Sequence, residues 1–192
     1  MTLVFATRNK SKLFEVQALI NNSLIKLLTL DDIQYVDELP EPHDSIQANA
    51  IEKSTTLYAN THYNCFSDDS GLEVEALNGA PGVHSAMYAG LHRSDKDNIN
   101  KLLHQLENQG NRNARFITII CLIIENEQYL FEGIVNGSIS SKPLGDNGFG
   151  YDPIFIPNGY NTTFAQMTLA EKNSISHRAI AIRKLATFLN SL

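Results

Sequence analysis

Asp68 and Asp69 are two adjacent carboxylates that follow an apolar segment, in the stretch Ser-Asp-Asp-Ser-Gly-Leu at 67–72. Two acids at the end of a strand commonly hold a hard divalent cation while leaving a carboxylate to act as a general base. The same residue types also form a solvated Asp-Ser-Gly turn, and the stretch taken alone favours the turn. A metal site and a surface turn therefore both stay open for these acids.

A second polar stretch, Thr-Arg-Asn-Lys-Ser-Lys at 7–12, lies between a predicted strand and a predicted helix. The apolar residues 2–6 favour the strand, and the apolar positions within 11–20 favour the helix. Backbone amides at the start of a helix, together with two lysines, can bind an anion such as a phosphate group. A polar loop with an ordinary helix cap explains the stretch equally well.

Residues 147–153 form a third stretch, Asn-Gly-Phe-Gly-Tyr-Asp-Pro. Its two glycines would let the backbone approach a ligand closely, and Phe149 and Tyr151 would offer flat faces to a heterocyclic base. A glycine-rich loop whose aromatic side chains fill the core is the more common use of this pattern. The stretch thus predicts either a base-stacking site or a core loop.

A fourth stretch, Glu-Lys-Asn-Ser-Ile-Ser-His-Arg at 171–178, lies where the last predicted helix begins, at about Ser174. Lys172, His177 and Arg178 would all lie near the N-terminus of that helix, where the macrodipole disfavours positive charge. Such a cluster becomes favourable when an anion or a ligand rich in hydrogen-bond acceptors lies between the cations. We therefore interpret the stretch as a candidate ligand site.

The elements that must hold these four stretches alternate between strand and helix patterns. Ser45 offers a cap for a helix, whereas Pro40 and Pro42 make residues 31–44 a loop. Parallel strands joined by helices, together with an antiparallel hairpin, predict an α/β fold with a mixed sheet flanked by helices. We find no repeat and no linker, and expect one domain over residues 1–192. Strands are predicted at 2–6, 25–30, 65–67, 115–125 and 128–140, and helices at 11–20, 45–60, 95–108 and 174–189.

Composition and charge exclude several classes of protein. The chain has 192 residues, 43% of them hydrophobic, and its 15 Lys plus Arg against 21 Asp plus Glu give a formal net charge of -6. This charge disfavours binding to nucleic acid, although a local group of cations or a metal can still attract a nucleotide. The longest apolar run, 116–124, is far shorter than the roughly 20 residues of a membrane helix. Since no signal-peptide pattern precedes Arg8 and two cysteines lie in apolar surroundings, we expect a cytoplasmic protein with no membrane partner.

Taken together and in this order, the four stretches resemble the inosine triphosphate pyrophosphatase family over nearly the whole chain. The resemblance is carried by Thr-x-Asn-x-x-Lys near the N-terminus, Asp-Asp-Ser-Gly-Leu running on to Gly-Ala-Pro-Gly-Val, Gly-Phe-Gly-Tyr-Asp-Pro-Ile-Phe, and Glu-Lys-Asn-x-x-Ser-His-Arg. It implies hydrolysis of nonstandard purine nucleoside triphosphates (ITP, dITP and XTP) to the monophosphate and pyrophosphate. It also implies a Mg²⁺ cofactor, a homodimer, and two lobes with an active-site cleft between them.

The resemblance further implies roles for individual residues. Asp69 would be the general base, with Asp68 as a supporting acid. Mg²⁺ would be bound by Asp69 and Glu41, with Glu38 as the fallback for Glu41. Residues 7–12 and Lys53 would bind the phosphates, and the later residues the purine and sugar. The full substrate-binding set would be Thr7, Arg8, Asn9, Lys10, Ser11, Lys12, Lys53, Ser70, Phe149, Gly150, Tyr151, Asp152, Lys172, His177 and Arg178.

Three positions depart from the family pattern. Arg8 and Ser11 replace residues that are usually glycine, and Met87 replaces the usual Arg or Lys near the nucleotide. Two alternatives stay open: these departures favour the first, and the second shares the need for a metal and a phosphate loop. One is a nucleotide-binding module with little turnover, and the other is a pyrophosphatase that acts on modified pyrimidine nucleoside triphosphates.

Overall fold

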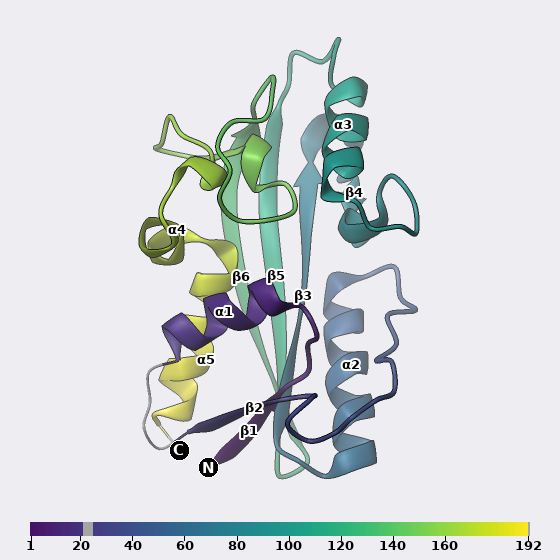
Figure 1. Ribbon diagram of the computed structural model, residues 1–192, viewed down its shortest axis with the longest axis vertical. Helices are drawn as coiled ribbons and strands as arrows, with labels where there is room; N and C mark the ends of the chain where they lie inside the picture. Colours follow the sequence, from purple (N-terminus) through teal and green to yellow (C-terminus); the bar gives the residue numbers. More distant parts are fainter. Residues whose placement is uncertain (21–24, 192) are drawn as a thin grey trace. The chain divides into compact units, whose positions relative to one another are not determined.

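The described part of the chain forms a mixed sheet of seven strands with helices (Figure 1). This confirms the predicted α/β fold with a mixed sheet, but adds two short strands, β4 and β7, to the five that the sequence predicts. The computed structural model describes residues 1–20 and 25–191. The strand order is β2-β1-β3-β5-β6-β7, and β4 pairs with β3. Strand β1 is parallel to β2 and β3, whereas β4 and β7 are antiparallel to their partners. The strands are β1 Thr2–Phe5, β2 Lys26–Thr29, β3 Cys65–Val74, β4 Pro81–Gly82, β5 Asn113–Ile124, β6 Glu127–Ile139 and β7 Phe155–Pro157.

Helices begin where a side chain caps their free amides. Asn9, Ser45, Ser94 and Thr168 each accept a hydrogen bond from an amide in the first turn of the helix that follows, which confirms the predicted Ser45 cap. None of the helices in the described part of the chain is long and apolar enough to cross a membrane. The helices are α1 Lys10–Leu19, α2 Ile46–Thr61, α3 Asp95–Gln105, α4 Leu169–Ile175 and α5 His177–Leu189, with short 3-10 turns η1 Glu75–Leu77, η2 Ser85–Met87, η3 Asp152–Ile154 and η4 Phe164–Gln166.

The predicted hairpin at 115–125 and 128–140 is confirmed as β5 and β6, which are neighbours in the sheet. The two residues between them, Glu125 and Asn126, have φ values of 50° and 69°. Two successive residues with positive φ match the twist of the flanking strands and close a tight hairpin.

Strand β3 is longer than the sequence predicts, and this corrects the interpretation of Asp-Asp-Ser-Gly as a turn or a strand end. The prediction ended the strand at Ser67, but β3 continues to Val74, so Asp68 and Asp69 lie in its middle. The extension is held by pairing of Leu72 with Gly82, which belongs to the short strand β4. A local pattern does not reveal this pairing, because the partner lies ten residues further along the chain.

The predicted start of the last helix, 174–189, is also wrong. Ser176 is extended, with ψ of 153°, and separates α4 from α5. Thr168 and Glu171 form a capping box that begins α4 before the predicted start, whereas His177 begins α5. Arg178 therefore lies in the first turn of α5, as predicted, but Lys172 belongs to a separate short helix.

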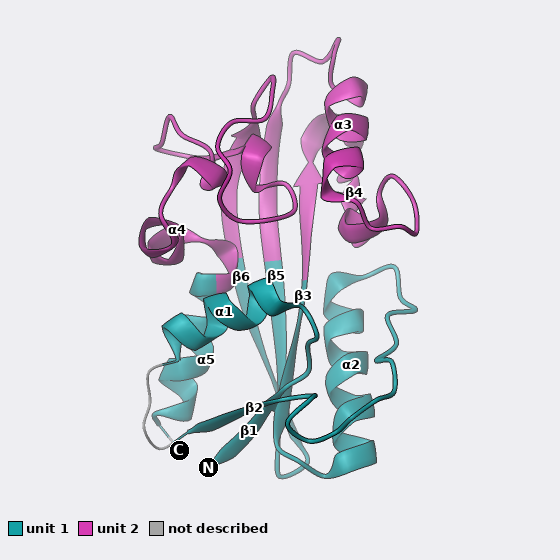
Figure 2. Cartoon of the chain, in the orientation of Figure 1, with its two compact units in different colours: residues 1–69, 118–133, 179–192 teal, residues 70–117, 134–178 magenta. Residues whose placement is uncertain are grey.

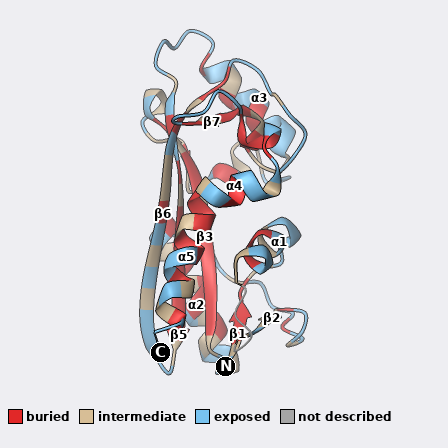
Figure 3. Ribbon diagram, turned by 90° about the vertical axis from the view of Figure 1, so that its left-hand side faces the viewer, coloured by how far each residue is buried: buried red, intermediate tan, exposed pale blue. Residues whose placement is uncertain are grey.

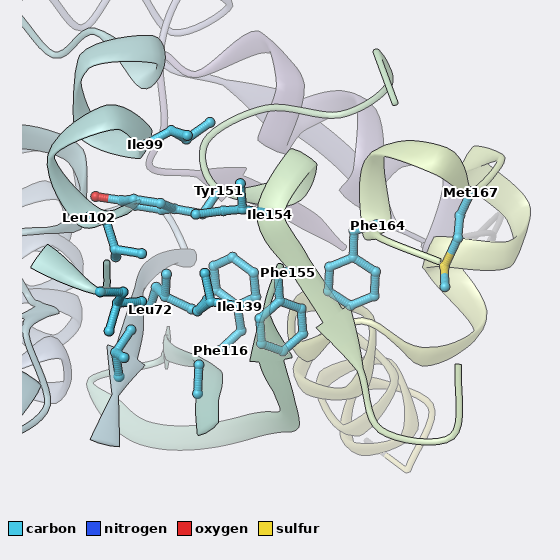
Figure 4. Close-up of a cluster of buried hydrophobic side chains, with 13 residues drawn as sticks. Leu72, Ile99, Leu102, Phe116, Ile139, Tyr151, Ile154, Phe155, Phe164 and Met167 are labelled. Atoms are coloured by element: carbon cyan, nitrogen blue, oxygen red, sulfur yellow. The ribbon is translucent and has the colours of Figure 1, made fainter. Parts of the chain in front are cut away.

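The chain divides into two compact units (Figure 2), and each has a core of its own. Unit 1 is Met1–Asp69, Thr118–Gly133 and Ala179–Leu192; unit 2 is Ser70–Ile117 and Ile134–Arg178. In unit 1 the rings of Phe5 and Phe66 stack at 4.5 Å within a core that α1 and α5 cover. In unit 2, Phe116, Phe155 and Phe164 pack together (Figure 4). The prediction of one domain stays a prediction.

Alternation along β3 decides which helix each of its side chains meets. Phe66 packs into the core beneath α1 and α5. Its neighbours point the other way, toward α2: Cys65 Sγ lies 3.5 Å from Ser54 O, and Ser54 Oγ donates to Ser67 Oγ at 2.9 Å. Nearly all of β3 is buried (Figure 3). The two acids that follow Ser67 therefore continue this alternation in a buried setting.

Candidate active site

In unit 1, the ammonium group of Lys53 gathers three oxygens that come from different parts of the chain. Its Nζ donates to Glu41 Oε1 at 2.6 Å, to the Asp68 carbonyl at 2.6 Å and to Asp69 Oδ1 at 3.4 Å. Lys53 is 6% exposed, and it projects from α2 toward β3. The lysine therefore brings together the two acids, Glu41 and Asp69, that the sequence predicts as metal ligands.

Asp69 combines burial with an unused oxygen. It is 9% exposed, and its Oδ2 has no hydrogen-bond partner among the described residues. Burial raises the pKa of Asp69, and the opposing charges of Lys53 and Lys12 do not cancel this effect. The pKa of Lys53 is also raised: burial alone lowers it, but the charges of Asp69, Glu41 and Asp68 outweigh burial. Asp69 is thus a carboxylate with higher proton affinity than an exposed one.

Asp68 has a different lysine partner. Its Oδ1 accepts from Lys12 Nζ at 2.9 Å, and the acid is 2% exposed. Lys12 comes from α1, whereas the lysine beside Asp69 comes from α2. Since successive side chains of a strand point to opposite faces, each acid has its own cation.

The stretch 7–12 forms a capped helix start. Asn9 Oδ1 accepts from the amides of Ser11 and Lys12, at 2.9 Å and 3.2 Å, and Thr7 Oγ1 accepts from the Asn9 amide at 3.2 Å. These three amides therefore already have a partner within the stretch, as an ordinary cap requires. Of the predicted phosphate-binding residues, Lys12 is brought to the acids, while Lys10 and Ser11 are exposed.

Arg8 points along the loop that precedes α2. Its guanidinium donates to the Tyr35 carbonyl at 2.7 Å and to the Asp37 carbonyl at 3.1 Å. Arg8, which the sequence predicts as a phosphate contact, therefore binds two backbone carbonyls of the segment that precedes Glu41.

The donor set of unit 1 suits a hard divalent cation. Glu41 and Asp69 supply carboxylate oxygens, and one of these, Asp69 Oδ2, is buried without a partner. Within the described ranges 1–20 and 25–191, no group of three or more His, Cys, Asp or Glu side chains is arranged so that it could hold a metal ion. Magnesium is commonly held by one or two carboxylates together with substrate phosphates, so two acids are sufficient. Glu41 and Asp69 both pair with the Lys53 ammonium, so Glu41 lies beside Asp69. This favours Glu41 over its alternative Glu38 as the second ligand.

In unit 2, a second cluster surrounds the ring of Phe149. Lys172 and Asp152, 4% and 3% exposed, form an ion pair of 2.6 Å between Nζ and Oδ2. The same oxygen accepts from the Phe149 amide at 2.9 Å. The Lys172 ammonium lies 5.0 Å from the centre of the Phe149 ring, and the Arg178 guanidinium carbon lies 5.5 Å from it. The ring therefore lies beside two buried cations.

Arg178 and His177 begin α5 with buried side chains. Arg178 is 3% exposed and donates to Ser70 Oγ at 3.2 Å, which places the predicted substrate contact Ser70 in the same cluster. The His177 ring stacks on Phe116, with 4.5 Å between centroids and planes 7° apart. The cluster thus contains the predicted residues Ser70, Phe149, Asp152, Lys172 and Arg178, whereas the predicted residue His177 precedes Arg178 in α5 and packs on Phe116.

Tyr151 follows the core alternative for this loop and not the base-stacking one. Its ring belongs to the core of unit 2 (Figure 4), and its hydroxyl donates to the Ser85 carbonyl at 2.9 Å. Burial also raises the pKa of Tyr151. Phe149, which is half-buried, is therefore the ring of this loop that can meet a ligand, whereas Tyr151 fixes the loop to the core.

Asp95 also belongs to this region, although no motif in the sequence points to it. Its Oδ2 accepts from the Gly150 amide at 2.7 Å. The cap Ser94 indicates that Asp95 begins a helix, but no sequence signal links that helix start to a loop 55 residues later.

The two clusters have complementary chemistry. The cluster of unit 1 offers two lysines, Lys12 and Lys53, and carboxylates for a cation, which is what a polyphosphate with a metal ion needs. The cluster of unit 2 offers an aromatic ring and buried donors, which suits a flat heterocycle with acceptors.

Comparisons with known proteins agree with this chemistry. The model of the Ham1 family matches residues 3–188. A protein of Flavobacterium psychrophilum named dITP/XTP pyrophosphatase is 51% identical over 191 residues, covering 100% of both chains. The solved structure of the Staphylococcus aureus Ham1 protein is 36% identical, has a TM-score of 0.91 and covers 100% of this chain and 99% of that one. A Ham1 protein from Coxiella burnetii, also 36% identical and with complete coverage of both chains, has a TM-score of 0.93.

Proposed function

The chain belongs to the Ham1 family, and from this premise we propose that it hydrolyses nonstandard purine nucleoside triphosphates, namely ITP, dITP and XTP, to the nucleoside monophosphate and pyrophosphate. The observation that carries the proposal is the buried Asp69 carboxylate, which shares the Lys53 ammonium with Glu41. The relatives named dITP/XTP pyrophosphatase support the choice of substrate.

The cluster of unit 1 acts on the phosphates. Lys12 and Lys53 neutralise charge on the triphosphate, which makes attack by water on the α-phosphorus possible. Asp69 Oδ2, a buried oxygen with no hydrogen-bond partner in the described chain, is the atom to which we assign the proton of that water. The oxygen of the water bonds to the α-phosphorus, the bond from this phosphorus to the bridging oxygen breaks, and pyrophosphate leaves with that oxygen. The raised pKa of Asp69 favours this role.

Mg²⁺ is the cofactor that we propose for this cluster. Glu41 and Asp69 would hold it, because carboxylate oxygens are the hard ligands that this ion prefers. When bound, the ion supplies positive charge against the roughly four negative charges of a triphosphate. Asp68 supports the arrangement by holding Lys12 in place.

The cluster of unit 2 selects the base. Phe149 stacks on the purine, and Arg178 donates to the 6-oxo group that hypoxanthine and xanthine carry. Adenine has an amino group at this position, so two donors would face each other and leave buried groups unpaired, at a cost of about 1–3 kcal/mol. The ion pair with Asp152 fixes Lys172 beside the Phe149 ring.

Release of pyrophosphate from a panel of triphosphates in the presence of Mg²⁺ tests this function. We expect ITP, dITP and XTP to be cleaved at least about tenfold faster than ATP, the scale of one mispaired group in the site. Nucleotide binding without release of pyrophosphate would show a binding module instead. Faster cleavage of modified pyrimidine triphosphates would show the other alternative, and either result would overturn the proposal.

The proposal extends to the setting of the enzyme. We propose that it acts in the cytoplasm as a homodimer, with a nucleotide as its ligand and with no nucleic-acid or membrane partner. The reduced, buried Cys65 and Cys121 and the net charge of -6 support this setting. Sedimentation velocity on the purified protein tests the dimer, and a monomer at micromolar concentration would contradict it.

A further inference from the structure

Phe149 lies between two glycines in its loop. Gly148 and Gly150 flank it with φ values of 77° and 60°, a region that glycine adopts readily and other residues rarely adopt. Glycine also has the widest choice of alternative conformations. Two glycines around one aromatic residue therefore leave the direction of its ring poorly fixed by the local chain.

Both ends of this loop are anchored within unit 2. At one end, the Asn147 amide donates to the Ala165 carbonyl at 3.0 Å. At the other end, the Tyr151 ring is buried in the core and its hydroxyl binds the Ser85 carbonyl. The tip of the loop, which consists of residues 148–150, lies between these two anchors.

Two carboxylates hold successive amides of the tip. The Phe149 amide donates to Asp152 at 2.9 Å, and the Gly150 amide donates to Asp95 at 2.7 Å. Asp152 belongs to the loop itself and is already paired with Lys172. Asp95 is different because it comes from another element, α3.

Helix α3 is a firm support for such a contact. Ile99 and Leu102 are buried in the core of unit 2, and Ser94 caps the helix by accepting from the Asp97 amide. Asp95 projects from the first turn of this fixed helix. A charged acceptor on a packed helix can therefore hold the amide of Gly150 with a short hydrogen bond.

From this geometry we propose that Asp95 is a positioning residue: it fixes the Gly148–Gly150 tip and thereby presents the Phe149 ring to the purine. This inference rests on the proposed function. Binding of the nucleotide costs less conformational entropy when the Phe149 ring is already held in place. Asp95 contributes to binding of the base alone, so its loss should not change the affinity of the site for the phosphates.

The test compares Asp95→Ala with two other variants. Asp97→Ala is the matched control, since Asp97 is also an exposed acid in the first turn of α3, but its carboxylate contacts His92. Asp95→Asn keeps an acceptor oxygen and should restore most of the effect. Hydrogen exchange of peptides covering 147–153 reports the loop directly. Steady-state kinetics on ITP, with inhibition by inosine monophosphate and by pyrophosphate, report the two halves of the substrate.

For Asp95→Ala we expect faster exchange in the tip, a KM for ITP raised about tenfold with kcat within about twofold, and weaker inhibition by inosine monophosphate. Inhibition by pyrophosphate should be unchanged, and Asp97→Ala should behave as the wild type. Unchanged exchange in the tip, or equal weakening of both inhibitors, would overturn the inference. If the wild type did not cleave ITP, the proposed function would fail, and the exchange data alone would support or overturn the role of Asp95 in holding the tip.

Discussion

Lys172 and Asp152 form a direct ion pair, 2.6 Å between Nζ and Oδ2, although both side chains are almost fully buried. The pair also ties α4 to the loop that carries Phe149, whose amide donates to the same Asp152 oxygen. A buried charge is tolerated only while it is paired, because transfer out of water is costly. This ion pair therefore contributes both to the stability of unit 2 and to the geometry of its candidate base site.

The first prediction concerns that ion pair. Asp152→Ala leaves the Lys172 ammonium buried without its carboxylate and should lower the free energy of unfolding by about 3–5 kcal/mol. Urea denaturation followed by circular dichroism measures this. The pair between Glu73 and Arg115, also 2.6 Å but partly exposed, is the matched control, and Glu73→Ala should cost about 1 kcal/mol or less. Equal losses in the two variants would contradict the prediction.

The second prediction assigns the base. Asp69→Asn should lower kcat by about 100-fold or more while the protein folds and keeps substantial affinity for ITP, because a general base is removed. Asp68→Asn, which changes the neighbouring acid that binds Lys12, should affect KM more than kcat. The kcat and KM values for ITP distinguish the variants. Turnover near the wild-type value in Asp69→Asn would remove this residue from the role.

The third prediction concerns the metal. Glu41→Gln should raise the Mg²⁺ concentration for half-maximal rate at least about tenfold, the lower end of what loss of a metal-site partner costs. Glu38→Gln should leave this concentration unchanged, because the structure brings Glu41 to the Lys53 ammonium beside Asp69. A Mg²⁺ titration of the rate measures both. A shift in Glu38→Gln alone would move the ligand to Glu38.

The fourth prediction tests how the base is read. Arg178→Ala should lower the rate on ITP about tenfold or more beyond its effect on the small residual rate on ATP, because a 6-oxo purine accepts from the guanidinium and adenine does not. The ratio of the two kcat/KM values is the measurement, made on a variant with a normal melting temperature. If both rates fell by the same factor, Arg178 would serve the phosphates or the fold instead.

The fifth prediction concerns alkaline pH. Burial raises the pKa of Cys65 to about 12, with a further contribution from Cys121, and burial raises the pKa of Cys121 to about 11. In the unfolded chain both thiols ionise near their ordinary value of 9.0, so ionisation favours the unfolded state above that pH. Stability from these groups is complete below about pH 9 and is lost as the pH rises toward 11 and 12.

Melting temperatures between about pH 8 and pH 10.5 measure this loss. In the double variant Cys65→Ala with Cys121→Ala, the decline with pH should be shallower than in the wild type. A decline of the same slope in both proteins would show that other groups cause it.

Local patterns were sufficient for much of the fold. The Ser45 cap and the turn at Glu125 and Asn126 depend on side chains and φ values within a few residues, so they could be predicted. The extent of β3 could not, because it depends on pairing with Gly82 and so on a contact outside the local segment. The break at Ser176 is a different case: the capping box of Thr168 and Glu171, which begins a helix of its own, is a local signal that the prediction of one helix over 174–189 did not use.

The same distinction applies to the candidate site. The motifs point to Asp69, Lys172 and Arg178, and the family resemblance points to Lys53; these residues lie in the two clusters that the structure shows. The sequence did not reveal that Tyr151 lies in the core or that Arg8 binds the carbonyls of the loop before α2. A residue type predicts which chemistry is possible, but the direction of a side chain depends on the tertiary fold.

The alternation of β3 also predicts which genetic changes this chain tolerates. Because successive side chains of a strand point to opposite faces, Asp68 contacts Lys12 and Asp69 contacts Lys53. Deletion of one codon between Phe66 and Asp69 would exchange the helix that each remaining acid faces, whereas most substitutions would alter one contact. Comparison of natural variants should therefore show length changes in surface loops and none in this part of β3.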